Sequence, residues 1–311
     1  MRALVVAVLI FAAACSSGDD DATRNTERPA TSAPPDGTRK ITVDGRERTY
    51  LVHRPTTIDT DDPTSLVVVL HGGFGTGAQA RQSYGWDAKA DAEGFVVAYP
   101  NGVDKAWNAG TCCGRPQRDN IDDVKFLGAA IDEIVDAEGV VPDRVYATGI
   151  SNGGMMAYRL ACELPGKVVA IGPVAASMTV GCADPPPRPV GVLHIHGLDD
   201  RNVPFNGGVG TKGVAKDPRP SIPSVIERWR AVDACPGPPV TTTAGAVTTV
   251  TSSPCAAGTE VVLITVAGAG HQWPGSAPAS EAARRALDLD VPSTALDATS
   301  MLWDFFSRQP L

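Results

Sequence analysis

Ser151 lies within the sequence GISNGG at residues 149–154, which matches the pattern Gly-x-Ser-x-Gly. A predicted strand at residues 144–148 precedes the serine, and a predicted helix at residues 152–163 follows it. The serine is therefore predicted to occupy a sharp strand-to-helix turn, which lifts its hydroxyl above a sheet while the glycines allow neighbouring backbone to come close. The pattern alone can arise by chance, but in this context it indicates a nucleophile.

Two further polar segments follow predicted strands. HIHGLDD at residues 194–200 ends in the carboxylates Asp199 and Asp200, and GAGHQWPG at residues 268–275 places His271 among small residues. A histidine can take the serine proton, and a carboxylate fixes the histidine tautomer and stabilises imidazolium. We therefore expect Ser151, one of the two aspartates and His271 to serve as nucleophile, acid and base.

The sequence LHGGFG at residues 70–75 follows another buried strand and resembles a loop that supplies half of an oxyanion hole. We expect the Gly73 N–H to be one donor, with the Phe74 N–H as the alternative. The N–H of Asn152 is the expected second donor. The default role of His71, and of His194 and His196, which share one strand face by period two, is structural.

Alternating strands and helices must position these residues. Buried strands are predicted over residues 65–70, 95–99, 144–148, 168–174, 190–195 and 261–266. Helices are predicted over residues 78–92, 120–137, 152–163, 223–229 and 293–308. The Asp-Gly pair at 44–45 predicts a hairpin, residues 240–253 predict a strand pair, and residues 202–223 predict a long loop beside the active site. The fold class is α/β: a single domain with a mostly parallel central sheet and helices on both faces.

Together these segments resemble the polyhydroxybutyrate depolymerase and feruloyl esterase family, which consists of carbohydrate esterase family 1-like α/β hydrolases, and in particular its actinobacterial lipoprotein branch. The resemblance covers residues 38–308 and includes WNAGTCCG at 107–114, YATGISNGGMMAYRLAC at 146–162 and GHQWPG at 270–275. It implies the α/β-hydrolase fold. Many hydrolases carry His-Gly-x-x-Asp where this chain has residues 196–200, so the resemblance also implies Asp200 as the acid. Leu198 and Asp199 depart from the Thr-Ala or Thr-Glu of many members, which leaves Asp199 as a competitor.

The resemblance implies a secreted serine esterase that hydrolyses carboxylic esters through an acyl-enzyme, of the feruloyl-esterase or polyhydroxybutyrate-depolymerase type. Its substrate would be a small-molecule or polymeric ester. Other short-chain or acetyl esters are the alternative within this class, and a peptidase is a weaker option. A catalytically silent surface-binding module on the same scaffold is the alternative from another class. We expect no cofactor and no metal. Trp107 and Trp273 are candidate substrate-binding residues, with core packing as the alternative for each.

The ends and the charge of the chain indicate where it acts. A formal net charge of -8 argues against nucleic-acid binding. Arg2 and the apolar run at 3–14 predict a signal peptide at 1–15, because the run is too short to span a bilayer. AAAC at 12–15 resembles a lipobox and makes Cys15 a candidate for lipidation, although Ala12 stands where Leu is usual. Release after simple cleavage is the alternative.

Residues 16–37 predict a disordered tether and residues 38–311 the catalytic domain. We expect an exported monomer, extracellular or in the cell envelope, that meets the membrane only through its lipid anchor.

Apart from Cys15, six of the seven cysteines remain for disulfides. An even number in an exported protein predicts three bonds. We expect Cys235 to pair with Cys255 across the predicted strand pair. Adjacent cysteines seldom bond to each other, so we expect Cys112 and Cys113 each to pair with one of the remaining cysteines, which are Cys162 and Cys182.

Overall fold

The computed structural model describes residues 36–59, 62–182, 188–213 and 217–310. All of these residues fall in one unit of the chain. The predicted signal peptide, Cys15 and most of the predicted tether lie outside the described residues. Asp36 and Gly37 belong to the first strand, which begins two residues before the predicted domain boundary at residue 38. Within the described ranges, no helix is both long enough and apolar enough to cross a membrane.

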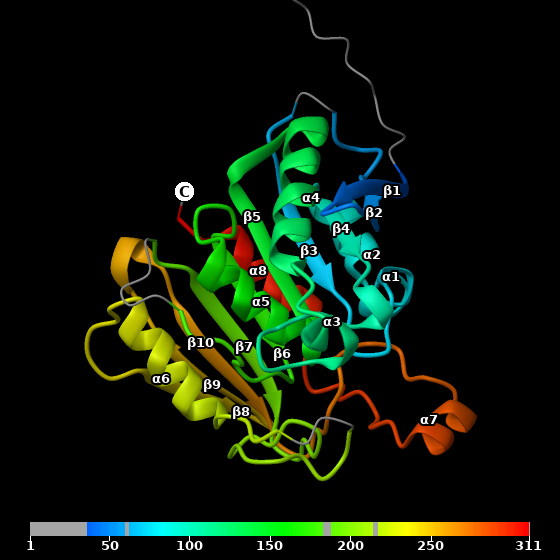
Figure 1. Cartoon of the computed structure of the whole chain (residues 1–311). Coiled ribbons are helices and arrows are strands. Elements are labelled where there is room, and N and C mark those ends of the chain that lie inside the picture. Colours follow the sequence, from blue (N-terminus) through cyan, green and yellow to red (C-terminus); the bar gives the residue numbers. More distant parts are fainter. Residues whose placement is uncertain (1–35, 60–61, 183–187, 214–216, 311) are drawn as a thin grey trace, which may run out of the picture. The chain divides into compact units, whose positions relative to one another are not determined.

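Ten strands in the described part of the chain form one sheet (Figure 1). The strands are β1 (Asp36–Val43), β2 (Arg46–His53), β3 (Thr64–Leu70), β4 (Val96–Pro100), β5 (Val140–Ile150), β6 (Ala170–Val174), β7 (Gly191–Gly197), β8 (Val240–Ala244), β9 (Val247–Ser252) and β10 (Val261–Val266). Their order across the sheet is β1-β2-β4-β3-β5-β6-β7-β10-β9-β8. The six central strands from β4 to β10 are parallel, and an antiparallel hairpin extends each side. The predicted mostly parallel sheet is confirmed.

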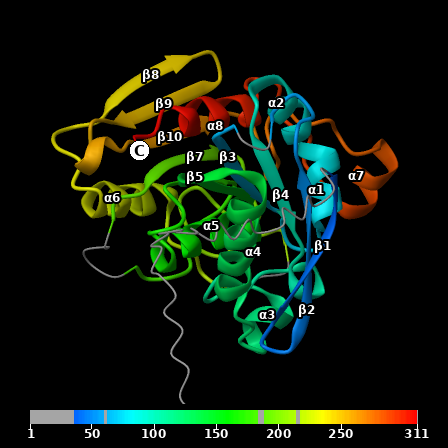
Figure 2. The same cartoon turned by 90° about the horizontal axis from the view of Figure 1, so that it is seen from above.

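Helices cover both faces of this sheet, as predicted (Figure 2). The helical segments are α1 (Gly77–Tyr84), α2 (Trp86–Glu93), η1 (Val103–Lys105), α3 (Gly114–Arg118), α4 (Asp123–Glu138), α5 (Asn152–Glu163), α6 (Ile222–Val232), η2 (Ala256–Gly258), α7 (Glu281–Leu287) and α8 (Ala298–Ser307). The core on one face contains residues of α4, α5 and α6. The core on the other face contains residues of α1, α2 and α8.

Strand β3 illustrates how the sequence builds these two cores. Leu66 and Val68 pack into the core with α4 and α5, whereas Val67 and Val69 pack into the core with α1 and α8. Successive side chains of a strand point to opposite faces, so a strand covered on both sides needs a continuous apolar run. The run at residues 65–70 meets that requirement, and the strand ends where the polar sequence at His71 begins.

Glycine and capping residues decide where several helices begin and end. The helix predicted over 78–92 is two helices, because Gly85 adopts a left-handed conformation with φ 75° between α1 and α2. Asp122 accepts a hydrogen bond from the Lys125 N–H and caps α4. The last helix begins at Ala298, five residues later than predicted, with Asp297 as its cap.

The three disulfides only partly follow the predicted pairing. Cys235–Cys255 is confirmed. The pairing predicted for the other four cysteines is wrong, because Cys112 bonds to Cys113 and Cys162 bonds to Cys182. The loop at residues 107–113 folds back on itself, with the Cys113 N–H donating to the Trp107 carbonyl at 3.0 Å. Cys162, at the end of α5, has its Cα 4.7 Å from that of Cys182, which is within the range that a disulfide can bridge.

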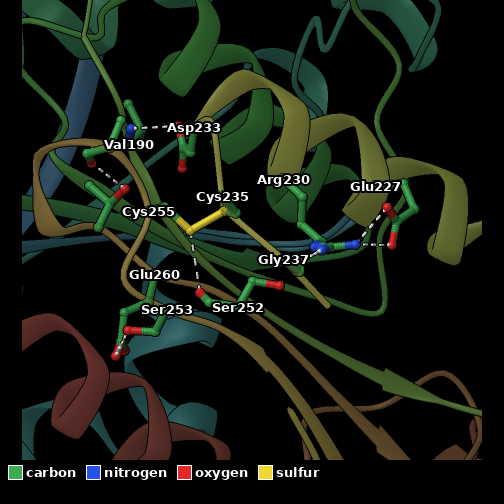
Figure 3. The surroundings of a disulfide bond; sticks show 12 residues. Val190, Glu227, Arg230, Asp233, Cys235, Gly237, Ser252, Ser253, Cys255 and Glu260 are labelled. Carbon is green, nitrogen blue, oxygen red and sulfur yellow. Dashed lines mark hydrogen bonds and ion pairs between the residues drawn. A yellow bond between two sulfur atoms is a disulfide. The ribbon is translucent and has the colours of Figure 1, made fainter. Parts of the chain in front are cut away.

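Asp233 is a fully buried carboxyl group close to the Cys235–Cys255 bond, as Figure 3 shows. One carboxyl oxygen accepts a hydrogen bond from the Val190 N–H at 3.2 Å. The other is buried and has no hydrogen-bond partner among the described residues. Burial raises the pKa of Asp233 to about 7, against the lowering effect of the Val190 hydrogen bond. The carboxyl group is therefore protonated in the folded chain at pH values where an unfolded aspartate is ionised.

This burial predicts that Asp233 makes stability fall as pH rises from about 4 to about 7. In that window the folded state holds a proton that the unfolded state has lost, so raising the pH favours unfolding. We expect Asp233→Asn to remove this dependence, with a gain over the wild type that grows across the window to an upper bound of about 4 kcal/mol. Urea unfolding of both proteins at several pH values measures the difference. A gain that is the same at every pH would contradict the prediction.

Candidate active site

The three predicted catalytic residues lie at one edge of the sheet. Ser151 follows β5, Asp200 follows β7 and His271 follows β10. These strands and β6 are neighbours and run parallel, so their carboxyl ends meet at the same edge (Figure 1). Parallel α/β sheets bind their ligands outside this edge.

Ser151 occupies a strained turn. Its φ of 55° and ψ of -122° are unusual for a residue with a side chain, and its N–H donates to the Val174 carbonyl at 2.9 Å. The glycines on either side of Ser151 make room for this turn, because the backbone at the end of β3 passes very close to both of them. A Cβ at Gly149 would lie 2.5 Å from the Leu70 carbonyl oxygen, and a Cβ at Gly153 would collide with the same oxygen. The turn therefore needs glycine on both sides of the serine.

Two backbone N–H groups are available beside this turn. Asn152 is the first residue of α5, so its N–H has no acceptor within the helix. The loop after β3 lies against the turn, because a Cβ at Gly72 would be 3.8 Å from the Ser151 Cβ. In this loop the Phe74 N–H already donates to the Lys105 carbonyl at 2.8 Å. The Gly73 N–H makes no hydrogen bond within the described ranges, which favours Gly73 over Phe74 as a donor.

His71 holds this loop in place. Its buried ring accepts from the Gly102 N–H at Nε2 (3.0 Å), so the proton of the neutral ring is on Nδ1, which donates to the Gly72 carbonyl at 2.8 Å. Burial lowers the pKa of His71 to about 4, although the Gly72 hydrogen bond opposes that effect. The geometry fits the structural role expected for this histidine.

Asp200 and His271 form a hydrogen-bonded pair. The Nδ1 of His271 donates to Oδ2 of Asp200 at 2.7 Å. The other carboxylate oxygen accepts from the N–H groups of Asn202 and Val203, both at 2.8 Å. Burial acts to raise the pKa of Asp200, but the hydrogen bond and charge of His271, together with His196 and the Val203 N–H, outweigh burial, and the pKa is lowered. An ionised, oriented carboxylate therefore faces the histidine. Asp199, the competing acid, is exposed.

The Ser151–His271 contact is not closed in this structure. No hydrogen bond joins the Ser151 hydroxyl to His271 among the described residues, whereas the His271–Asp200 bond is formed. In enzymes without substrate, hydrogen bonds of this kind are often long and tighten when the substrate binds. The fold thus joins the acid to the base and places the serine at the same edge.

Asp290 was not predicted and holds the loop that carries His271. Its Oδ2 accepts from the His271 backbone N–H at 2.7 Å, and its Oδ1 lies 3.0 Å from the Nζ of Lys212. A Cβ at Gly270 would collide with this carboxylate, so glycine precedes the histidine for a steric reason. Nothing in the sequence around Asp290 distinguishes it from other surface carboxylates.

Trp107 and Trp273, the candidate substrate-binding residues, are both buried, which favours the alternative of core packing for each. Trp107 is 0% exposed; its Nε1 donates to the His71 carbonyl, and its backbone N–H and carbonyl both bond to the Asn152 side chain. It therefore ties the loop of Gly73 to the start of α5. Trp273 is 2% exposed and stacks on Tyr84, with ring centroids 4.5 Å apart.

Two exposed apolar side chains flank the site instead. Phe74, next to Gly73, is 75% exposed and has a left-handed φ of 66°. Leu198, two residues before Asp200, is 43% exposed. Exposure and strain in one aromatic residue mark a candidate contact for a ligand. A large apolar residue inside a glycine-rich turn was the available sequence signal.

The chain was compared with known proteins. No protein-family model matches it. It is 33% identical over 309 residues to the proposed esterase NocK of Nocardia uniformis subsp. tsuyamanensis. This match covers 88% of this chain and 89% of NocK. It is 29% identical over 233 residues to feruloyl esterase B of Piromyces equi, which covers 72% of this chain but only 42% of that enzyme.

A solved structure shares the fold. The acetyl xylan esterase from Aspergillus awamori superposes with a TM-score of 0.57 at 14% identity, over 81% of this chain and 98% of the other. The relationship to NocK extends over nearly the whole length of both chains and includes the elements that carry the site. The chain therefore belongs to the esterase family that includes NocK and is a carboxylic ester hydrolase with the α/β-hydrolase fold.

Proposed function

We propose that the chain hydrolyses carboxylic esters through an acyl-enzyme formed on Ser151. His271 takes the serine proton as the hydroxyl attacks the ester carbonyl, and Asp200 stabilises the resulting imidazolium. The N–H groups of Gly73 and Asn152 hold the oxyanion. His271 then protonates the leaving alcohol, and water hydrolyses the acyl-enzyme by the reverse arrangement. The observation that carries this proposal is the Asp200–His271 hydrogen bond at the sheet edge where Ser151 occupies its strained turn.

We propose esters of aromatic acids, of the feruloyl type, as the preferred substrates. Phe74 supports this choice, because an exposed aromatic ring beside the oxyanion donor can stack on the ring of a hydroxycinnamoyl group. The relative named feruloyl esterase B is consistent with the same chemistry. Polyhydroxybutyrate and acetylated xylan are the competing substrates, and parallel assays on both would rank them against methyl ferulate.

We also propose that the chain is exported and anchored through Cys15. The apolar run at 3–14, the Cys15 that ends it and the three disulfides of the folded domain support export to an oxidising compartment. A lipid on Cys15 would hold the enzyme at the membrane surface and leave the catalytic domain in the medium.

Replacement of the nucleophile tests the mechanism. Ser151→Ala should keep the fold and lose nearly all ester hydrolysis, because it removes the hydroxyl on which the proposed acyl-enzyme forms. Covalent labelling by a fluorophosphonate should disappear in the same variant, with circular dichroism as the control for folding. A Ser151→Ala protein that hydrolyses p-nitrophenyl acetate at the wild-type rate would exclude this serine as the nucleophile.

The two adjacent aspartates form a matched pair for testing the acid. Asp200→Asn should lower kcat by about 10⁴-fold, because an amide favours the wrong histidine tautomer and cannot stabilise imidazolium. Asp199→Asn should change kcat far less, since that side chain is exposed. Steady-state kinetics of both variants decide the assignment. The reverse ranking would make Asp199 the acid.

Phe74 provides a test of the acyl group. Phe74→Ala should lower kcat/KM for methyl ferulate by roughly three- to tenfold, the expected value of one aromatic contact, and leave methyl acetate unchanged. The two esters release the same alcohol, so the comparison isolates the acyl side. Phe74→Trp should keep the preference, and Leu198→Ala serves as a second exposed truncation. An equal loss on both esters would reject an acyl-side role for Phe74.

A further inference from the structure

A row of three buried polar rings ends beneath Asp200. Tyr158 comes from α5, and His194 and His196 come from β7. The Tyr158 hydroxyl lies 2.8 Å from Nδ1 of His194, and Nε2 of His194 lies 3.0 Å from Nδ1 of His196. Nε2 of His196 lies 2.9 Å from the Val203 carbonyl oxygen. All three side chains are almost completely buried, so bulk solvent does not reach these contacts.

Only one arrangement of protons satisfies this row. The Val203 carbonyl can only accept, so Nε2 of His196 must carry a hydrogen. Burial lowers the pKa of His196 to about 4 and also lowers the pKa of His194 well below its usual value, so both rings are neutral. The Nδ1 of His196 therefore accepts from Nε2–H of His194, whose own Nδ1 accepts from the Tyr158 hydroxyl. Every bond of the row points toward Val203.

The row contacts the acid turn at two places. Val203, whose carbonyl ends the row, donates its own N–H to Oδ1 of Asp200 at 2.8 Å. The Nε2–H of His196 also lies 3.6 Å from Oδ2 of Asp200, the oxygen that accepts from His271. Asp200, His271 and His194 are the titratable groups that act on or contact His196, and the Phe205 ring packs near it. The opposite tautomer would turn a lone pair toward the carboxylate and the carbonyl.

We propose that Tyr158, His194 and His196 are positioning residues that hold an N–H group against the Asp200 turn and so aim its carboxylate at His271. The Val203 carbonyl sets the direction of the row, and the Tyr158 hydroxyl, which can donate or accept, completes it by donating to Nδ1 of His194. The inference rests on the proposed function in one respect: it takes Asp200 to be the acid of the reaction. None of the three residues touches the substrate.

The tautomers can be measured directly on the folded wild-type protein. Two-bond ¹H–¹⁵N correlation spectra should show His194 and His196 as neutral Nε2–H rings from pH 5 to pH 8. His71 is an internal control, because its contacts require the opposite, Nδ1–H, tautomer. Replacing each ring in turn by glutamine assigns the signals. An Nδ1–H tautomer for His194 or His196, or protonation of either ring near pH 6.5, would overturn the proposal. This measurement needs no esterase activity. A failure of the proposed function can therefore be told apart from a failure of the proposed proton arrangement.

The positioning role is tested by Tyr158→Phe. Removal of the hydroxyl should lower kcat on methyl acetate about three- to tenfold, as expected for the loss of one buried hydrogen bond, with KM unchanged. His194 and His196 should keep their Nε2–H tautomers in the same variant, because the Val203 carbonyl still accepts from His196. Tyr146→Phe is the matched control, since Tyr146 is also buried but lies in the other core. Fluorophosphonate should also label Ser151 more slowly in Tyr158→Phe than in Tyr146→Phe. A Tyr158→Phe protein with wild-type kcat would overturn the positioning role.

Discussion

The site depends on the close approach of backbone around Ser151. Strand β5 must turn into α5 within one residue while the Leu70 and His71 carbonyls of the neighbouring strand end pass alongside. Side chains at residues 149 and 153 would push these segments apart. A conformation like that of Ser151 costs on the order of 1–3 kcal/mol, and it persists because the surrounding packing fixes it. The N–H of Asn152 and the loop of Gly73 reach the serine only because this turn is so tight.

Burial then decides which polar groups near the site can change their charge. His71, His194 and His196 are buried, and their lowered pKa values keep them neutral as hydrogen-bonding elements. Asp200 is also buried, but it accepts three hydrogen bonds, and its pKa is lowered instead of raised. His271 is the histidine that pairs directly with this carboxylate. The same burial therefore produces neutral scaffolding in one place and a fixed negative charge in another, depending on the donors within reach.

The loops at the carboxyl edge are held by contacts between segments far apart in the sequence. Trp107 joins the His71 carbonyl to the Asn152 side chain, so the two expected halves of the oxyanion hole are linked through one residue. Asp290 joins the His271 backbone to Lys212 of the long loop. Such contacts fix the distances between groups that arrive on different strands, which is what catalysis by orientation requires.

The sequence by itself determined the features that local spacing encodes. Apolar β-branched runs marked the central strands, and glycines beside a serine marked the strained turn, because both follow from interactions among residues near one another in the chain. The structure confirms the mostly parallel sheet, and it places Ser151, Asp200 and His271 after the expected strands. Which aromatic residues are buried was decided only by tertiary packing. Trp107 and Trp273 look like candidate ligand contacts in the sequence, but the loops and helices that cover them come from distant segments. The pairing of Cys112 with Cys113, the support from Asp290 and the proton order of Tyr158, His194 and His196 were likewise outside the reach of the sequence. Each depends on which side chains meet across the fold, and residue spacing along a single chain carries no information about that.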